Sequence, residues 1–338
     1  MIITRAPLRI SFVGGGTDIK DFYEKYPGRV ISSTIDKHVY SVINYGRLLD
    51  SFVIKYLETE KASHPSEFKH SRFRETMLRL NVVEPGLEIA SFADLPGNTG
   101  LGSSSSFTVA LLKAINAHHG VAINKQQAAE LACEIEIDIL KEPIGKQDQF
   151  ASAYGGFNVF QFNPDGTVDV DPIFIDYKVR ADLEDHAVLF FTGITRSAST
   201  VLSEQKTSMA EKFETYKQMS DSVLVFKDKL IAGDMRGMAE MLHEGWERKK
   251  SLAGAISNSA IDELYTEARK LGAWGGKVLG AGGGGCLFFI APPETHAVIG
   301  SGLKAQAEKL GMEGFKEIDF DFSQSGADVL FNSLSHHA

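Results

Sequence analysis

The stretch Asp94-Leu-Pro-Gly-Asn-Thr-Gly-Leu-Gly-Ser-Ser-Ser-Ser106 decides the fold, because it joins a predicted strand to a predicted helix. The preceding segment, Leu87–Phe92, alternates apolar and polar side chains, and the following segment, Phe107–His119, has the apolar spacing of a helix. A glycine loop that opens a helix leaves backbone N–H groups unpaired at the positive end of the helix dipole. The stretch therefore predicts an anion site suited to a phosphate group.

Other interpretations of this loop are less consistent with its residues. A Walker A loop needs Gly-Lys-Ser/Thr, and the loop contains no lysine. A dinucleotide-binding loop needs a third glycine that is missing here. A plain turn with serine N-caps stays open on this stretch alone, so the rest of the chain must supply further signals.

Composition restricts the class of protein. A length of 338 residues predicts two domains, and a net charge of −9 argues against a surface built for nucleic acid. The two cysteines, Cys133 and Cys286, lie in apolar stretches and are predicted to be buried thiols, which fits a reducing compartment. No segment reaches the roughly 18 apolar residues of a membrane span, and the N-terminus lacks the apolar stretch of a signal peptide. We expect a cytoplasmic protein with no membrane or nucleic-acid partner.

The order of the predicted elements favours an α+β fold with mainly antiparallel sheets. Strands and helices alternate without the regular βαβ spacing of a doubly wound sheet. Residues 125–140 are predicted to form one helix, and residues 176–185 are charged and lack apolar periodicity. We place the domain boundary in that charged segment, which gives domains 1–180 and 181–338.

The N-terminal run Ala6-Pro-Leu-Arg-Ile-Ser-Phe-Val-Gly-Gly-Gly-Thr-Asp18 has two interpretations. It is either an edge strand that ends in a turn, or a substrate loop. In the second case Arg9 directs a guanidinium at a reacting oxygen, the glycines allow close approach of a polyol, and Asp18 accepts hydrogen bonds from two hydroxyls.

Two later runs also carry polar chemistry. Glu134-Ile-Glu-Ile-Asp138 is followed by Gly145-Lys-Gln-Asp148, and a solvated helix face explains two of the first three acids. Phosphoryl transfer from ATP needs a hard cation and a group that orients or deprotonates the attacking hydroxyl, and carboxylates supply both. The run Lys277-Val-Leu-Gly-Ala-Gly-Gly-Gly-Gly-Cys286 is either a flexible hairpin or a loop that another backbone approaches closely.

Taken in order, the four runs resemble the motifs of the GHMP kinases, the family of galactokinase, homoserine kinase, mevalonate kinase and phosphomevalonate kinase. The resemblance implies an N-terminal domain like domain 2 of ribosomal protein S5, a ferredoxin-like C-terminal domain, and phosphoryl transfer from ATP with Mg²⁺ to an alcohol. It assigns Asp148 to the acceptor hydroxyl and Arg9 to the charge that develops there. It gives Mg²⁺ to Glu136 and Ser104, with Ser103 and Ser105 open as alternatives to Ser104.

The resemblance also implies two sets of binding residues. The predicted ATP-binding residues are Pro96, Gly97, Gly100, Leu101, Gly102, Ser103, Ser104 and Ser105. The predicted substrate-binding residues are Gly15, Gly16, Thr17, Asp18, Lys146, Arg196, Gly282, Gly283 and Gly284.

Differences between this sequence and the first motif of galactokinases limit the choice of sugar substrate. Gly15 and Gly16 stand where galactokinases carry Glu and His, which argues against galactose. The runs 7–18, 33–40, 146–149 and 192–196 look like those of bacterial D-glycero-α-D-manno-heptose 7-phosphate kinases, which phosphorylate the anomeric O1.

The phosphate group of a sugar phosphate needs positively charged side chains around it in the binding site. The candidates are Arg196, Lys146, Lys37 and the 69–74 cluster, for which a solvated helix face is the favoured interpretation. Two alternative functions stay open: a fucose or other sugar 1-kinase, and a non-catalytic sensor of sugar and ATP. A related decarboxylase is disfavoured. A homodimer is left open as the oligomeric state.

Overall fold

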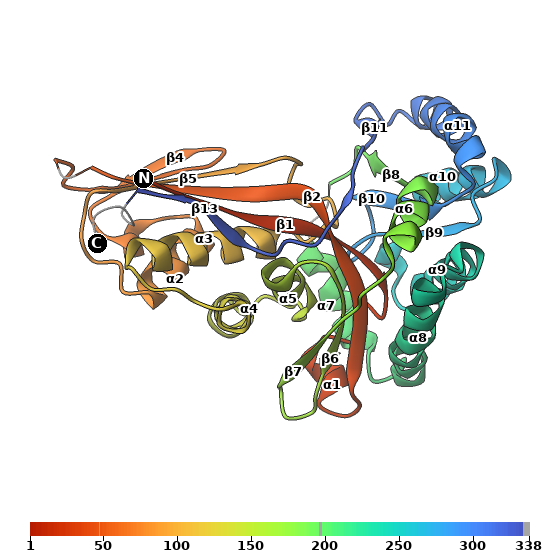
Figure 1. Ribbon diagram of the computed structural model, residues 1–338, viewed down its shortest axis with the longest axis horizontal. Coiled ribbons are helices and arrows are strands. Elements are labelled where there is room, and N and C mark those ends of the chain that lie inside the picture. Colours follow the sequence, from red (N-terminus) through yellow and green to blue (C-terminus); the bar gives the residue numbers. More distant parts are fainter. Residues whose placement is uncertain (47, 196–197, 334–338) are drawn as a thin grey trace.

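The computed structural model describes residues 1–46, 48–195 and 198–333. The chain builds two units side by side, each with its own sheet and its own helices (Figure 1). The strands of the first sheet are β1 (Ile2–Val13), β2 (Gly28–Tyr45), β3 (Phe52–Lys55), β4 (Thr59–Ala62), β5 (Leu87–Ala93), β6 (Phe157–Phe162), β7 (Val168–Pro172), β12 (Phe322–Ser323) and β13 (Asp328–Asn332). The strands of the second sheet are β8 (Ala187–Thr192), β9 (Gly275–Val278), β10 (Cys286–Ile290) and β11 (Phe315–Glu317).

Helices cover the sheets of both units. Those from the first half of the chain are α1 (Lys20–Tyr23), α2 (Ser71–Arg79), α3 (Ser103–His118), α4 (Lys125–Cys133) and α5 (Gln147–Tyr154). Those from the second half are α6 (Tyr177–His186), α7 (Ala198–Ser208), α8 (Phe213–Ala232), α9 (Met235–Lys250), α10 (Ser259–Lys270) and α11 (His296–Lys309). Within the described part of the chain, no helix is long and apolar enough to cross a membrane.

The first sheet is organised around β2, which runs the length of the unit. It pairs antiparallel with β1, β5, β6 and β12, and β1 in turn pairs antiparallel with β13. The neighbours β3 and β5 run parallel. Helix α3 packs against β1 and β2, and α2, α4 and α5 lie on the same side of the sheet (Figure 1). A helix is thereby held across the strand that carries Arg9.

The second unit has a four-stranded antiparallel sheet in the order β11-β8-β10-β9. The two units share a buried aromatic cluster: the Phe12 ring contacts Phe157 and Phe322 from the first sheet, Phe288 from the second, and Phe226 from α8. This packing fixes the units against each other, and the functional cavity described below lies where they meet.

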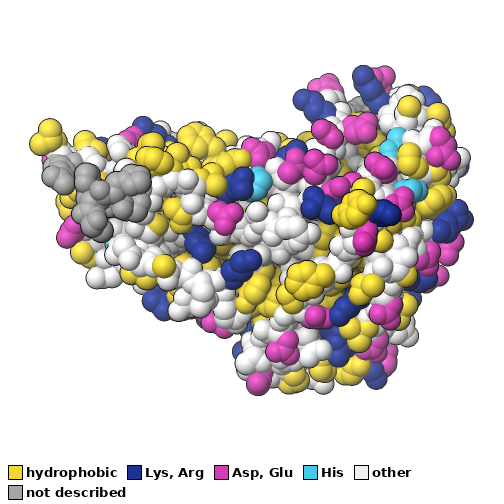
Figure 2. Space-filling model, viewed as in Figure 1, with side chains coloured by type: hydrophobic (Ala, Val, Ile, Leu, Met, Phe, Trp, Pro, Cys, Tyr) yellow, Lys and Arg dark blue, Asp and Glu magenta, His cyan; other side chains and the backbone are white. Residues whose placement is uncertain are grey.

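The α+β architecture predicted from the sequence is confirmed, as are the two buried thiols of Cys133 and Cys286. The boundary at 180/181 stays a proposal. It follows the change from the first sheet to the second, but β12 and β13 return from the C-terminal segment to pair with β2 and β1. On the face seen in Figure 2, acidic and basic side chains are interspersed over the second unit.

Three local features differ in detail from what the sequence suggested. The helix expected to begin at Phe107 begins at Ser103, because Gly102 adopts a left-handed conformation (φ 78°) and supplies the N-cap. The helix expected over 125–140 is α-helical only to Cys133 and continues as a π-helical turn, Glu134–Ile139. The charged segment 176–185 is helical, since the Asp176 side chain accepts a hydrogen bond from the Lys178 N–H (2.8 Å) and caps α6.

Candidate active site

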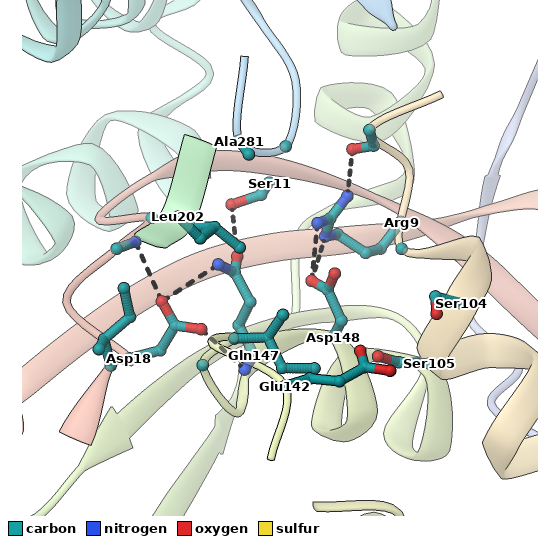
Figure 3. Close-up of a pocket in the computed structure, with 18 of the residues that line it drawn as sticks. Arg9, Ser11, Asp18, Ser104, Ser105, Glu142, Gln147, Asp148, Leu202 and Ala281 are labelled. Atoms are coloured by element: carbon teal, nitrogen blue, oxygen red, sulfur yellow. Dashed lines mark hydrogen bonds and ion pairs between the residues drawn. The ribbon is translucent and has the colours of Figure 1, made fainter. Parts of the chain in front are cut away.

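A cavity of about 340 Å³ lies between the two units and gathers residues from all four motif runs (Figure 3). Its walls come from β1, the glycine loops that follow β1 and β5, and the first turns of α2, α3 and α5. The segment before α5, helix α7, and the ends of α9 and β9 complete them. Positions from residue 9 to residue 281 meet there, although they are far apart in the sequence.

Arg9 and Asp148 form an ion pair in the wall of this cavity. The Arg9 Nε donates to Asp148 Oδ1 (2.8 Å), and Nη2 lies 2.7 Å from the same oxygen. The Arg9 Nη1 donates to the Gly100 carbonyl (2.6 Å), which ties the pair to the loop before α3. The Arg9 side chain is only 3% exposed, whereas the Asp148 side chain is 26% exposed and lines the cavity. One oxygen of Asp148 is held by arginine, so the other is left for a ligand.

The start of α3 faces the same cavity with its backbone N–H groups uncapped by any side chain. Gly102 brings the loop against the ion pair, because a Cβ at this position would lie 3.4 Å from both Arg9 Cγ and Asp148 Oδ2. The Ser106 hydroxyl donates to the Pro7 carbonyl (2.8 Å) and fixes the helix to β1. This geometry is an anion site directed at the ion pair.

The predicted ATP-binding residues divide into two groups. Gly100, Gly102, Ser103, Ser104 and Ser105 line the cavity. Pro96 and Gly97 are exposed outside it, and Leu101 turns into the core, where its carbonyl accepts a hydrogen bond from the Arg9 N–H (2.9 Å).

Glu136 is buried at 0% exposure beneath the serine turn and does not line the cavity. Its carboxylate accepts four hydrogen bonds, and the donors are Ser105 Oγ (2.7 Å), Gln149 Nε2 (2.5 Å), Thr108 Oγ1 (2.8 Å) and Arg72 Nε (3.1 Å). The serine beside Glu136 is therefore Ser105, and the predicted partner Ser104 is instead exposed at the cavity wall.

Asp18 is held in the opposite wall by the residue that precedes Asp148. Its Oδ1 accepts from the Gly16 N–H (3.0 Å) and from Gln147 Nε2 (3.2 Å), and its Oδ2 accepts from the Gln147 N–H (3.1 Å). Burial raises the pKa of the Asp18 carboxyl, and the nearby Asp148 charge raises it further, while the backbone N–H bonds act in the other direction. Gly15 and Gly16 line the cavity beside Asp18, as predicted.

Several predicted substrate residues lie elsewhere. Thr17 is buried and holds the turn through hydrogen bonds with the Arg29 backbone, and Lys146 donates to the Gly166 carbonyl (2.6 Å) outside the cavity. Arg196 lies outside the described residues.

The glycine run 282–284 does not line the cavity either, since the residues of this loop that reach it are Gly280 and Ala281. The run packs the loop against neighbouring backbones instead. The Gly283 N–H donates to the Ile256 carbonyl (2.7 Å), and a Cβ at Gly284 would lie 2.8 Å from the Ile194 carbonyl.

Two basic side chains of the cavity wall were not predicted as binding residues: Lys249 and Lys277. A third, Arg72, was predicted only as part of the 69–74 cluster, for which a solvated helix face was the favoured interpretation. Burial lowers the pKa of Lys249 to about 8 and that of Lys277 well below its usual value, and the neighbouring cations act in the same direction. A signal was present for Lys277, because it is a lone cation within the apolar segment 274–279 that was predicted to be a strand. The sequence gives no such signal for Lys249, because this residue lies in the charged end of a helix, Glu247-Arg-Lys-Lys250.

The chain matches two family models and is similar to known proteins over most of its length. The family model of the GHMP kinases N terminal domain matches residues 69–156, and that of the GHMP kinases C terminal matches residues 226–305. A mevalonate kinase of Archaeoglobus fulgidus is 32% identical over 229 residues, which cover 63% of this chain and 72% of that protein. The D-glycero-alpha-D-manno-heptose 7-phosphate kinase of Campylobacter jejuni is 28% identical over 341 residues, covering 96% of this chain and 97% of that protein.

Solved structures share the fold over nearly the full length. A D-glycero-D-manno-heptose 1-phosphate kinase from Bacteroides thetaiotaomicron superposes with a TM-score of 0.80 at 24% identity, covering 98% of this chain and 99% of that one. The galactokinase of Lactococcus lactis in complex with galactose gives a TM-score of 0.77 at 15% identity, covering 97% and 95%.

The uncapped start of a helix and an arginine–aspartate pair in one cavity are features that phosphoryl transfer can use. The chain belongs to the GHMP kinase family, whose members are ATP-dependent kinases that phosphorylate alcohol groups.

Proposed function

We propose that this protein is a sugar kinase that transfers the γ-phosphoryl group of ATP to the anomeric O1 of D-glycero-α-D-manno-heptose 7-phosphate, giving the 1,7-bisphosphate. The observation that carries the proposal is the Arg9–Asp148 pair, which lies between the start of α3 and the Asp18 wall. The similarity over 96% of the chain to a heptose 7-phosphate kinase supports the choice of acceptor.

In this mechanism the two walls hold the two substrates. The N–H groups at the start of α3 bind phosphate oxygens of ATP, and Gly100 and Gly102 let the nucleotide approach the backbone. Asp18, held by Gln147, accepts hydrogen bonds from sugar hydroxyls and fixes the ring beside Gly15 and Gly16.

Asp148 and Arg9 act on the reacting oxygen. The Asp148 oxygen that is not bonded to Arg9 accepts the proton of the attacking hydroxyl. The Arg9 guanidinium, fixed by Asp148 and Gly100, stabilises the negative charge that develops on that oxygen and on the transferring phosphoryl group. The protein thereby supplies positioning and charge, which phosphoryl transfer requires most.

The ATP complex is expected to carry Mg²⁺, which neutralises phosphate charge when it is bound. The Ser104 hydroxyl at the cavity wall is a suitable hard ligand. Glu136 does not fit direct coordination as it stands, because a carboxylate has about four acceptor positions and four protein donors occupy those of Glu136. Among the residues that the structure describes, no group of three or more His, Cys, Asp or Glu could hold a metal ion. We therefore propose that Glu136 fixes the start of α3, and its role as a metal ligand stays a prediction from the sequence.

The test is coupled ATP turnover with four acceptors: heptose 7-phosphate, mannose 6-phosphate, fucose and mevalonate. We expect kcat/KM to be highest for heptose 7-phosphate. A preference for fucose would assign the chain to an uncharged sugar, and binding of ATP and sugar without turnover would indicate a sensor. The homodimer and the cytoplasmic location stay predictions from the sequence.

A further inference from the structure

Among the positively charged side chains of the cavity wall, Lys249 has the fewest hydrogen-bond and ion-pair partners in the described part of the chain. It lies in the last turn of α9 with a side chain that is 6% exposed, and its Nζ donates to the Gly280 carbonyl. An ammonium carries three hydrogens, so one carbonyl leaves two of them without a protein acceptor in the part of the chain that the structure describes. No carboxylate of the described residues lies within ion-pair distance of it.

The other cations of the wall are occupied. Arg9 binds Asp148 and Gly100, and Arg72 binds Glu136 (3.1 Å) and Glu142 (2.6 Å). Lys277 donates to the carbonyls of Ser11 (2.9 Å) and Phe12 (2.7 Å).

A buried ammonium without a carboxylate is costly, and this cost is reflected in a pKa of about 8 for Lys249. An anionic ligand bound to Lys249 would reduce the free-energy cost of burying its charge. Arg9 and Arg72 are paired with carboxylates, and Lys277 donates to two carbonyls and Lys249 to one. Of the two lysines, Lys249 therefore has more hydrogens available to such a ligand.

The position of Lys249 assigns that ligand to the sugar side of the cavity. Lys249 also lines a second cavity of about 80 Å³, which lies behind Gly14 and Gly15 and shares Lys249 and Lys277 with the main one. Gly15 is the neighbour of Gly16, whose N–H binds Asp18. The ammonium thus lines the second cavity together with the glycine turn that is proposed to hold the sugar, and its hydrogen bond joins it to Gly280, which packs against Gly100.

We propose that Lys249 is the specificity-determining residue that binds the phosphate group already present on the sugar. This inference rests on the proposed function. A phosphomonoester supplies oxygens for both unused hydrogens of the ammonium and the negative charge that the buried cation lacks. An uncharged sugar leaves the cation unpaired, so Lys249 selects for phosphorylated acceptors.

The experiment compares Lys249→Met with Lys250→Met. Lys250 is the adjacent residue, but it forms surface ion pairs with Glu247 (2.8 Å) and Asp262 (3.6 Å), and its substitution removes the same charge outside the cavity. Steady-state kinetics are measured with heptose 7-phosphate and with the same heptose lacking the phosphate. For Lys249→Met we expect KM for the sugar phosphate to rise about 10- to 100-fold, which is the effect of losing a hydrogen bond between charged groups. We expect KM for ATP to change by less than about threefold, and Lys250→Met to resemble the wild type.

Four outcomes would overturn the assignment: an unchanged KM for the sugar phosphate, an equal rise for both sugars, a rise in KM for ATP instead, or the same change in Lys250→Met. Lys249→Arg keeps the charge and is expected to recover part of the affinity. If Lys249→Met does not fold, Lys249→Gln removes the charge and keeps a polar side chain. Loss of the preference for the phosphorylated over the free sugar in folded Lys249→Gln would then support the proposal, whereas an unchanged preference would contradict it. If wild-type enzyme prefers an uncharged sugar, the proposed function fails. If it prefers heptose 7-phosphate and Lys249→Met retains that preference, only the assignment of Lys249 fails.

Discussion

The Arg9 guanidinium binds a single oxygen of Asp148, with Nε at 2.8 Å and Nη2 at 2.7 Å from Oδ1. The two residues are 139 positions apart and come from β1 and α5. This asymmetric pairing matters because it fixes the aspartate while its second oxygen stays available to the cavity.

Asp148→Asn tests the role of that oxygen. The amide keeps an acceptor for Arg9 but is a poor proton acceptor, so we expect kcat to fall about 10²- to 10⁴-fold while ATP binding changes little. Single-turnover kinetics and nucleotide titration by calorimetry measure the two effects. Near-normal kcat would remove Asp148 from the mechanism.

Glu136→Gln tests whether the buried carboxylate is structural. It accepts hydrogen bonds from four donors, and replacing the charge by an amide places an NH₂ group among them, so we expect the free energy of unfolding to fall by about 1–3 kcal/mol. Urea denaturation without ligands measures this difference. An unchanged urea midpoint would contradict the structural role.

Ser104→Ala tests whether the Ser104 hydroxyl, on the exposed side of the turn above Glu136, is a ligand of Mg²⁺. The loss of one exposed hydroxyl should change the unfolding free energy by less than about 0.5 kcal/mol. If Ser104 ligates Mg²⁺, the Mg²⁺ concentration for half-maximal activity should rise several-fold, which a metal titration at saturating ATP would measure. Ser105→Ala is the matched variant, and a larger shift there than in Ser104→Ala would move the ligand role to Ser105.

Gly145→Ala tests the packing that holds Asp18. A Cβ at Gly145 would lie 2.0 Å from Asp18 Oδ2 and 2.9 Å from its backbone carbonyl carbon, so Asp18 must move. We expect KM for the sugar to rise at least about tenfold and the unfolding free energy to fall by about 1–3 kcal/mol. Gly97→Ala is the control, because nothing lies within 4 Å of a Cβ there, and it should leave KM unchanged. Equal effects of the two variants would mean that Asp18 is not held in this way.

Lys249 also predicts a pH dependence of stability. Its pKa is lowered from 10.5 to about 8 in the folded state by burial and by Arg9, against the opposing charges of Asp18 and Asp148. The unfolded chain therefore binds more protons between about pH 8 and pH 10.5, so the contribution of Lys249 to stability rises with pH across that window. Below about pH 8 the full cost of burying the charged form is present.

Urea denaturation of wild type and Lys249→Met at pH 7.5, 8.5 and 9.5 measures this contribution. Titrations shared by the two proteins cancel in the difference, and we expect wild type to gain stability relative to the variant as pH rises. A difference that is independent of pH would show that the lysine is not held at a lowered pKa.

Part of the site was predictable because the chemistry is local in sequence. The residue types of the glycine–serine loop before α3 predict an anion site, and Asp148 and Arg9 lie in runs whose residue types resemble those of a known family. The serine that contacts Glu136 was not predictable. Which of three consecutive serines faces a carboxylate depends on where α3 begins, and that is set by the left-handed Gly102 packed beside Arg9.

The sequence by itself determined the family, the α+β fold and the loop that opens α3, since these follow from residue type and short spacing. Only the tertiary structure decided the partners of Glu136, the place of Gly280 and Ala281 in the cavity wall, and the burial of Lys249 in that wall. The physical reason is that these features depend on contacts between α9, β1 and two glycine loops, and on the loss of solvent that follows from those contacts. Because these contacts remove solvent from Lys249, a lysine at the end of a helix becomes a buried charge with few partners.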